Sequence, residues 1–180
     1  MSLDGKVAFI SGGARGMGRD HAVALAAEGA DIITFDLCGP VATCRYPPAT
    51  PADLAETVSQ VEALDRRIVA RTADVRDEAA VRGVLAEGIA ALGRLDIVVA
   101  NAGIAPFIGE VAHTPAAWQD ALDALDALDA LDALDVMLTG VLHTIEPAVP
   151  ILVEQGSGGS DSSRFVTSTA LPVDAGNHAT

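Results

Sequence analysis

The feature that most constrains the fold of this chain is a regular alternation of short apolar runs with longer helical patterns. Four runs rich in β-branched residues predict strands buried on both faces, at residues 6–11, 31–36, 67–75 and 95–103. Between them, apolar residues recur three and four positions apart and predict helices at residues 18–30, 51–64 and 77–93. Because strand–helix–strand units of this kind form right-handed crossovers in one parallel sheet, the pattern predicts a doubly wound α/β fold.

Length and charge narrow the class of protein further. A chain of 180 residues fits a single domain spanning 1–180. The formal net charge of −14 disfavours nucleic acid and anionic membranes as partners. No uninterrupted apolar run reaches the ~18 residues of a membrane span, and no secretory signal pattern opens the chain. Two cysteines, Cys38 and Cys44, favour free thiols, so we expect a cytoplasmic protein without a membrane partner.

Two segments depart from the alternation. Residues 37–52 form a proline-rich insert after the second predicted strand, where four prolines exclude regular structure and indicate a loop or flap. From residue 154 onward a Gly- and Ser-rich stretch predicts a flexible linker, and residues 164–169 form a candidate fifth strand.

A glycine-rich segment joins the first predicted strand to the first predicted helix. Gly12, Gly16 and Gly18 let backbone N–H groups approach a diphosphate at the start of a helix, where the helix dipole favours anions. The alternative is a simple strand-to-helix turn. Asp36 ends the next strand, where a carboxylate can accept hydrogen bonds from ribose hydroxyls and repels a 2′-phosphate, whereas Arg15 could hold that phosphate. Because an unpaired carboxylate facing a phosphate is the costlier arrangement, NAD(H) is favoured over NADP(H).

Three motifs carry a resemblance to a known family. The segments SGGARGMG (11–18), ADV (73–75) and ANAG (100–103) resemble the cofactor-side motifs of the short-chain dehydrogenase/reductase family, and the proline-rich insert resembles its mycofactocin-associated, carveol-dehydrogenase-like, NAD-dependent branch. The resemblance implies a Rossmann-type sheet, here incomplete at the C-terminus. It also implies that NAD is bound by Gly12, Arg15, Gly16, Met17, Gly18, Asp36, Leu37, Asp74, Val75, Asn101, Ala102 and Gly103.

Within the family, Asp74 would accept a hydrogen bond from the adenine amino group, with the Val75 backbone beside it. Asn101, Ala102 and Gly103 would lie near the adenosine ribose. The alternative for Asp74 is an exposed helix N-cap.

The resemblance also implies hydride transfer between a small-molecule secondary alcohol or ketone and the nicotinamide, with a Tyr as general acid/base, a Lys and a Ser. Ser168 is the candidate catalytic serine, or Thr169 if the register moves by one. The Tyr would fall beyond Thr180, the sequence contains no Tyr-x-x-x-Lys, and Met137 stands where the family has an Asn of its proton relay. We therefore expect this chain, a C-terminally truncated relative, not to turn over by itself.

Residues 121–135 are one tripeptide, Ala-Leu-Asp, written five times. With four copies removed, the sequence reads TPAAWQDALDVMLTGVLHT, which resembles the long central helix of the family. Four copies turn an α-helix by three full turns plus about 120°. The two halves of the helix would then face different ways, and the leucines would wind around it. An acidic interaction or cation-binding module is the rival, but the spacing offers no closed oxygen cage. We interpret the repeat as an interruption of this helix. In the family the helix forms part of the subunit interface, so the tetramer of the family is in doubt and a homo-oligomer remains open.

Other candidates carry less. The histidines, His21, His113, His143 and His178, lack metal-ligand spacing, so no metal site is predicted. The three hypotheses are a relative of NAD-dependent dehydrogenases limited to binding dinucleotide, a non-catalytic assembly module using the acidic Leu/Asp helix, and a chain without a selected function.

Overall fold

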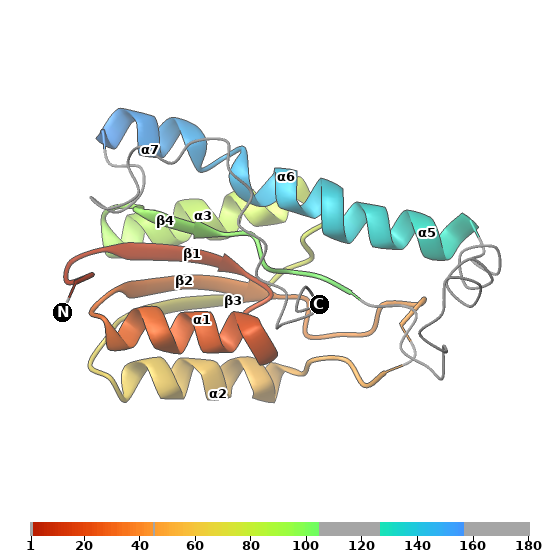
Figure 1. Ribbon diagram of the computed structural model, residues 1–180, viewed down its shortest axis with the longest axis horizontal. Helices are drawn as coiled ribbons and strands as arrows, with labels where there is room; N and C mark the ends of the chain where they lie inside the picture. The colour runs from red at the N-terminus through yellow and green to blue at the C-terminus, as the bar shows by residue number, and fades with distance from the viewer. Residues whose placement is uncertain (1, 45, 105–126, 157–180) are drawn as a thin grey trace, which may run out of the picture.

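The computed structural model describes residues 2–44, 46–104 and 127–156 and contains one parallel sheet (Figure 1). Its strands are β1 (Val7–Ser11), β2 (Asp31–Asp36), β3 (Ile68–Thr72) and β4 (Ile97–Val99), in the order β3-β2-β1-β4. The register pairs Phe9 with Ile33 of β2 and with Val98 of β4. The predicted doubly wound α/β fold is therefore present.

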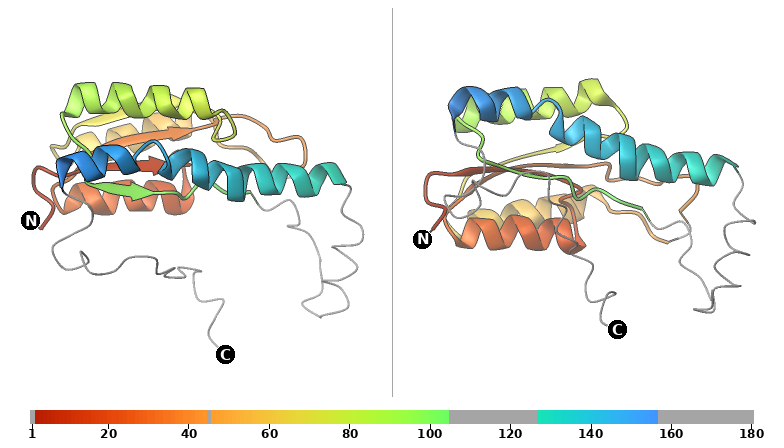
Figure 2. Two further views of the ribbon diagram at one scale, coloured as in Figure 1. Left: turned by 90° about the horizontal axis from the view of Figure 1, so that it is seen from above. Right: turned by 45° about the horizontal axis from the view of Figure 1, so that its top comes forward.

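Helices cover both faces of this sheet. Helices α1 (Gly16–Ala27) and α2 (Pro51–Glu62) lie on one face, and α3 (Glu78–Leu92) lies on the other (Figure 1). Beside α3 runs a second helical stretch made of α5 (Ala127–Leu134), the π-helical turn η1 (Asp135–Thr139), α6 (Gly140–Ile145) and α7 (Val149–Gln155). Its α5 end extends past the carboxyl ends of the strands (Figure 2).

The two faces of the central strand explain the two main clusters of the core. All five residues of β1 are buried, and successive side chains of a strand point to opposite faces. Phe9 packs with Phe35 and Val81 on the α3 side, whereas Ile10 packs with Ala22 on the α1 side. Small residues on α1 let that helix approach the sheet closely.

Local signals begin and end the helices. Thr50 and Asp53 form a capping box at the start of α2, and Pro51 is its first residue. Asp77 caps α3, and Gly93 ends that helix in a left-handed conformation. Asp74 is thus not the N-cap of α3.

The observed boundaries differ from the predicted ones at several ends. The strand predicted at 67–75 is β3, Ile68–Thr72, and the strand predicted at 95–103 contains β4, Ile97–Val99. Of the insert 37–52, the described residues up to 50 form no helix or strand, and its last two residues begin α2. The candidate strand at 164–169, His113, His178 and repeat residues 121–126 lie outside the described residues.

The helical run Leu131–Gln155 is long and apolar enough, by length and composition, to cross a membrane, with a mean hydropathy of 1.6. Only 28% of that window is buried. Its buried side contacts α3 and β4 through α6, and core helices that cross no membrane also meet this criterion of length and composition.

Candidate functional site

A cavity of about 470 Å³ lies at the carboxyl ends of the strands. Its walls come from the turns after β1, β2, β3 and β4, from the proline-rich insert and from Val136 of η1. In a doubly wound sheet this is the edge at which ligands bind, because the strand order changes direction there. The carboxyl edge is therefore the candidate site.

The glycine turn after β1 is packed too closely for side chains. A Cβ at Gly18 would lie 2.0 Å from the carbonyl oxygen of Gly12, and one at Gly13 would lie 1.9 Å from Oγ1 of Thr34. Gly12 adopts a φ of +74°, which favours glycine. The N–H groups of Gly12 and Gly13 both donate to the carbonyl oxygen of Phe35, at 2.8 and 3.1 Å. Those two donors fix the turn to β2.

The first turn of α1 presents backbone N–H groups that have no acceptor within the helix. Gly16, Met17 and Gly18 precede the first intrahelical donor, Arg19, whose N–H bonds to the carbonyl of Arg15. No side chain caps the helix, and its first turn contains no acidic residue, whereas α2 and α3 are both capped by their own side chains. An uncapped helix start facing a cavity suits a phosphate group.

Asp36 lies at the end of β2 on the cavity wall. Its Oδ2 accepts the N–H of Ala14 at 3.1 Å, and its Oδ1 accepts the N–H of Cys38 at 3.1 Å. The two bonds fix the carboxylate between the glycine turn and the start of the insert. Each oxygen retains a lone pair that a ligand hydroxyl can use.

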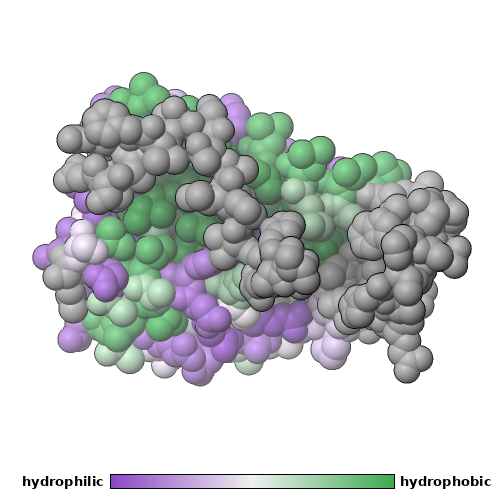
Figure 3. Space-filling model, viewed as in Figure 1, coloured by the Kyte–Doolittle hydropathy of each residue, from purple (hydrophilic) through white to green (hydrophobic). Residues whose placement is uncertain are grey.

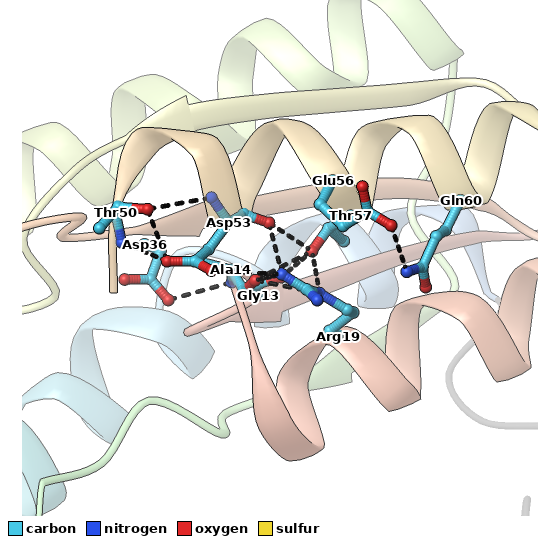
Figure 4. A network of polar contacts seen from close by, with 9 residues as sticks. All are labelled: Gly13, Ala14, Arg19, Asp36, Thr50, Asp53, Glu56, Thr57 and Gln60. Carbon is cyan, nitrogen blue, oxygen red and sulfur yellow. Dashed lines mark hydrogen bonds and ion pairs between the residues drawn. The ribbon is translucent and has the colours of Figure 1, made fainter. Parts of the chain in front are cut away.

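A polar network made by α2 and Arg19 of α1 supports the glycine turn, which lies between the two helices in Figure 4. The buried Thr57 hydroxyl donates to the carbonyl oxygens of Gly13 and Ala14, at 2.9 and 3.2 Å. Arg19 donates to the carbonyl oxygen of Ala14 and, through Nη2, to that of Asp53 at 2.7 Å. These contacts satisfy the carbonyl groups that the turn directs inward.

Sequence reasoning missed Thr57 and Arg19. A signal was present, because Thr57 is a polar residue on the apolar stripe of α2, between the buried Leu54 and Val61.

A second contact joins the turn to the end of β4. The Nδ2 group of Asn101 donates to the carbonyl oxygens of Ser11 and Gly12, at 2.9 and 3.2 Å. The Ser11 hydroxyl in turn accepts the N–H groups of Asn101 and Ala102. Asn101 therefore holds the first and fourth strands in register at the cavity floor.

Asp74 follows β3 and pairs with Arg76 at 2.7 Å. Burial works to raise the pKa of Asp74, but the hydrogen bonds and charge of Arg76 outweigh it, so the pKa lies below its ordinary value. The group is thus an ionised acceptor on the cavity wall.

The insert contributes the outer wall. The Arg15 guanidinium lies 5.7 Å from the centre of the Tyr46 ring, in a cation–π arrangement. Cys44 and Tyr46 line the cavity, and burial, followed by the charge of Asp36, raises the pKa of the Cys38 thiol.

The structure brings the predicted cofactor residues to one place. All of them line this cavity: Gly12, Arg15, Gly16, Met17, Gly18, Asp36, Leu37, Asp74, Val75, Asn101, Ala102 and Gly103. Ser168, the candidate catalytic residue, lies outside the described residues, and Met137 is 54% exposed. His143 bonds through Nδ1 to the Val75 carbonyl at 3.0 Å. Within residues 2–44, 46–104 and 127–156, no cluster of His, Cys, Asp or Glu could hold a metal ion.

A parallel sheet of this order, with a glycine turn opening α1 and an acidic residue ending β2, defines the Rossmann-type class of α/β proteins. The family model described as short chain dehydrogenase matches residues 6–160. The chain belongs to the short-chain dehydrogenase/reductase family.

Two curated relatives and one solved structure illustrate the similarity. The chain is 45% identical over 160 residues to an uncharacterized NAD-dependent oxidoreductase of Mycobacterium tuberculosis, covering 88% of this chain and 54% of that protein. It is 40% identical to the (−)-trans-carveol dehydrogenase of Rhodococcus erythropolis, covering 88% and 53%. The carveol dehydrogenase of Mycobacterium avium, crystallised with NAD, is 47% identical with a TM-score of 0.78, covering 88% and 53%. The chain therefore spans about half the length of the curated relatives it matches.

Proposed function

We propose that these 180 residues form the dinucleotide-binding part of an NAD(H)-dependent oxidoreductase. The observation that carries the proposal is the uncapped, acid-free start of α1, which faces the same cavity as Asp36. The N–H groups of Gly16, Met17 and Gly18 would hold the diphosphate, and Asp36 would accept the hydroxyl groups of the adenosine ribose. Asp74 would accept a hydrogen bond from the adenine amino group, as the resemblance implies.

Two further facts support this choice of cofactor. Asp36 already holds two backbone donors, so a 2′-phosphate placed there would meet a fixed negative charge. The names of relatives that are 45–48% identical mention NAD.

Titration of NADH, followed by nicotinamide fluorescence, tests the proposal. We expect saturable binding of NADH and at least roughly tenfold weaker binding of NADPH, because one like-charge contact separates the two ligands. Asp36→Ala should bring the affinities for NADH and NADPH closer together, because it removes that like-charge contact. Gly18→Ala should abolish binding, because its Cβ would collide with the Gly12 carbonyl group. Absence of NADH binding to the folded wild-type chain at millimolar concentration would refute the proposal.

The bound nicotinamide would supply hydride transfer to or from a small secondary alcohol or ketone. The residues of the cavity would bind and orient the dinucleotide. The sequence contains no Tyr-x-x-x-Lys, and Lys6 is its one lysine. We therefore propose binding without turnover by these 180 residues. Mixing NADH with a set of ketones should leave its absorbance constant, and its consumption would refute this part.

A second candidate, assembly through the helical run, is favoured by one specific observation. Exposed apolar side chains form a single stripe along it, at Leu131, Leu134, Leu138, Leu142, Ile145, Val149 and Val153, and green surface follows this ridge in Figure 3. The stripe is typical of a helix that pairs with another apolar helix. Size-exclusion chromatography with light scattering tests it: we expect a dimer or larger species, and a monomer unchanged by removing four repeat copies would exclude this role.

A further inference from the structure

The Ala-Leu-Asp repeat reaches the candidate site through one carboxylate. Oδ1 of Asp132 accepts a hydrogen bond from Nη1 of Arg76 at 2.9 Å, and its Oδ2 accepts the hydroxyl of Thr43 at 3.2 Å. The Asp132 side chain is only 25% exposed. One residue of the repeat thus joins the proline-rich insert to the turn after β3.

Both joined segments form walls of the cavity. Thr43 stands between Val41 and Cys44, which line it, and Arg76 follows Asp74 and Val75, which also line it. Asp132 itself does not line the cavity; it lies one helical turn before Val136, which does. Its position therefore lets it act on the site only through its two partners.

Arg76 transmits this contact to Asp74. The same guanidinium that reaches Asp132 donates through Nε to both oxygens of Asp74, at 3.1 and 3.0 Å, and through Nη2 to Oδ2 at 2.7 Å. A guanidinium is planar and rigid, so fixing Nη1 fixes the direction of Nε and Nη2. The backbone N–H of Arg76 also donates to Oδ1 of Asp74, at 2.9 Å, so Asp132 acts on the Asp74 carboxylate through the three guanidinium bonds alone.

We propose that Asp132 is a positioning residue for the adenine end of the dinucleotide site. It holds Arg76 so that Asp74 presents a fixed, ionised acceptor to the 6-amino group of the base. This inference rests on the proposed function, since it assigns Asp132 a part in the specificity of that same site. The repeat thereby contributes a side chain to the site, in addition to lengthening the helix.

The period of the repeat preserves this carboxylate. Asp132 stands four residues before Val136, and removing residues 121–132 would place Asp120 at that same distance. The four-copy deletion is therefore a control that shortens the helix and retains an aspartate at the contact.

The experiment measures dissociation constants of two dinucleotides for the full chain and its variants. The probes are NADH and its hypoxanthine analogue, in which a carbonyl oxygen replaces the adenine amino group. Asp132→Asn should weaken NADH binding about fivefold and analogue binding less than about twofold, because only NADH offers the amino donor to Asp74. Asp135→Asn, one copy later and exposed, should change neither constant, and the 121–132 deletion should retain the wild-type preference for NADH.

Each other outcome has a definite meaning. If the wild-type chain binds neither dinucleotide, the proposed function fails and the inference fails with it. If NADH binds but Asp132→Asn leaves both constants unchanged, or weakens both equally, only the positioning role is overturned. A deletion variant that behaves like Asp132→Asn would refute the claim that Asp120 takes the place of Asp132.

Discussion

At the scale of single residues, two buried polar side chains stabilise different parts of the fold. Thr57 supports the glycine turn of the candidate site, whereas Asp96 ties the start of β1 to the loop before β4. Each makes hydrogen bonds that join segments far apart in the sequence, so each gives a test by a near-isosteric substitution.

Replacing Thr57 by Val keeps the shape of the side chain and removes its hydroxyl group. The carbonyl group of Gly13 then loses its 2.9 Å donor. We expect a loss of about 1–3 kcal/mol in the free energy of unfolding, the usual cost of an unsatisfied buried polar group. NADH binding should weaken as well. Urea denaturation measures the first effect, with Ser59→Ala on the exposed side of α2 as the matched control; equal stabilities of the two variants would contradict the role of Thr57.

Asp96 should contribute to acid sensitivity. Its side chain is 4% exposed; burial works to raise its pKa, but bonds from Arg94, Val7 and Lys6 outweigh this and lower the pKa below 3.8. A carboxyl group whose pKa is lower in the folded state stabilises the protein at pH values above its unfolded-state pKa. This stability is lost as the pH falls through the folded-state pKa. The loss should therefore begin near pH 4 and continue below it.

Asp96→Asn removes that titration. The variant should be less stable at neutral pH by about 1–3 kcal/mol, because it disturbs the acceptor of the buried Val7 N–H group. Its stability should also fall less steeply below pH ~4. Urea denaturation at a series of pH values measures both, and parallel curves for variant and wild type would exclude the contribution of Asp96.

At the scale of elements, α3 contains two glycines in opposite surroundings. A Cβ at Gly83 would meet nothing within 4 Å, whereas one at Gly88 would lie 2.5 Å from Cδ1 of the buried Ile33. Gly83→Ala should stabilise the protein by about 0.5–1 kcal/mol, because alanine favours the helix. Gly88→Ala should destabilise it by about 1–3 kcal/mol through overpacking.

Thermal unfolding of the two α3 variants checks this pair, with each glycine serving as the control for the other. In an Ile33→Ala background, Gly88→Ala should lower the melting temperature less than it does in the wild type, because the shorter side chain at position 33 leaves room for the added Cβ. Equal melting temperatures for the two single variants would contradict the close approach of α3 to β2.

The π-helical turn η1 explains how the repeat meets the fold. The inward residues of the long helical run are spaced four apart, at Asp132, Val136, Gly140 and Thr144. This spacing exceeds the 3.6-residue period of an α-helix. In η1 the N–H of Gly140 bonds to the carbonyl of Asp135, and this wider turn absorbs the excess. The last two leucines of the repeat, Leu131 and Leu134, consequently join the exposed stripe and do not wind away from it.

At the scale of the whole molecule, the candidate site is assembled from the turns after the four strands, the proline-rich insert and Val136, which only the fold brings together. Saturating NADH should slow amide exchange in peptides that contain residues 12–18, 36–41, 73–76 and 101–104, because ligand binding stabilises the structures that form the site. Peptides from α7, whose residues do not line the cavity, should exchange as before. Protection confined to other peptides would contradict the placement of the site.

The sequence predicted the parallel α/β fold, and, with the family resemblance, part of the lining of the cavity; Val136 and most of the insert residues that line it were not predicted. Strand and helix periods are local properties, and the glycine turn and Asp36 each follow a strand directly, so their common edge could be derived. The orientation of the repeat was not predicted, because it depends on a π-helical turn for which the local sequence gives no signal.

Only the tertiary structure showed what supports and what orients the site. Thr57 donates a hydrogen bond to Gly13, and Asp132 contacts Arg76 and Thr43, although these partners are 44, 56 and 89 residues apart in the chain. The periodicity of a segment determines which face of an element is buried. Which polar side chain meets which partner on that face depends on how two packed elements align, and this alignment is a property of the whole fold.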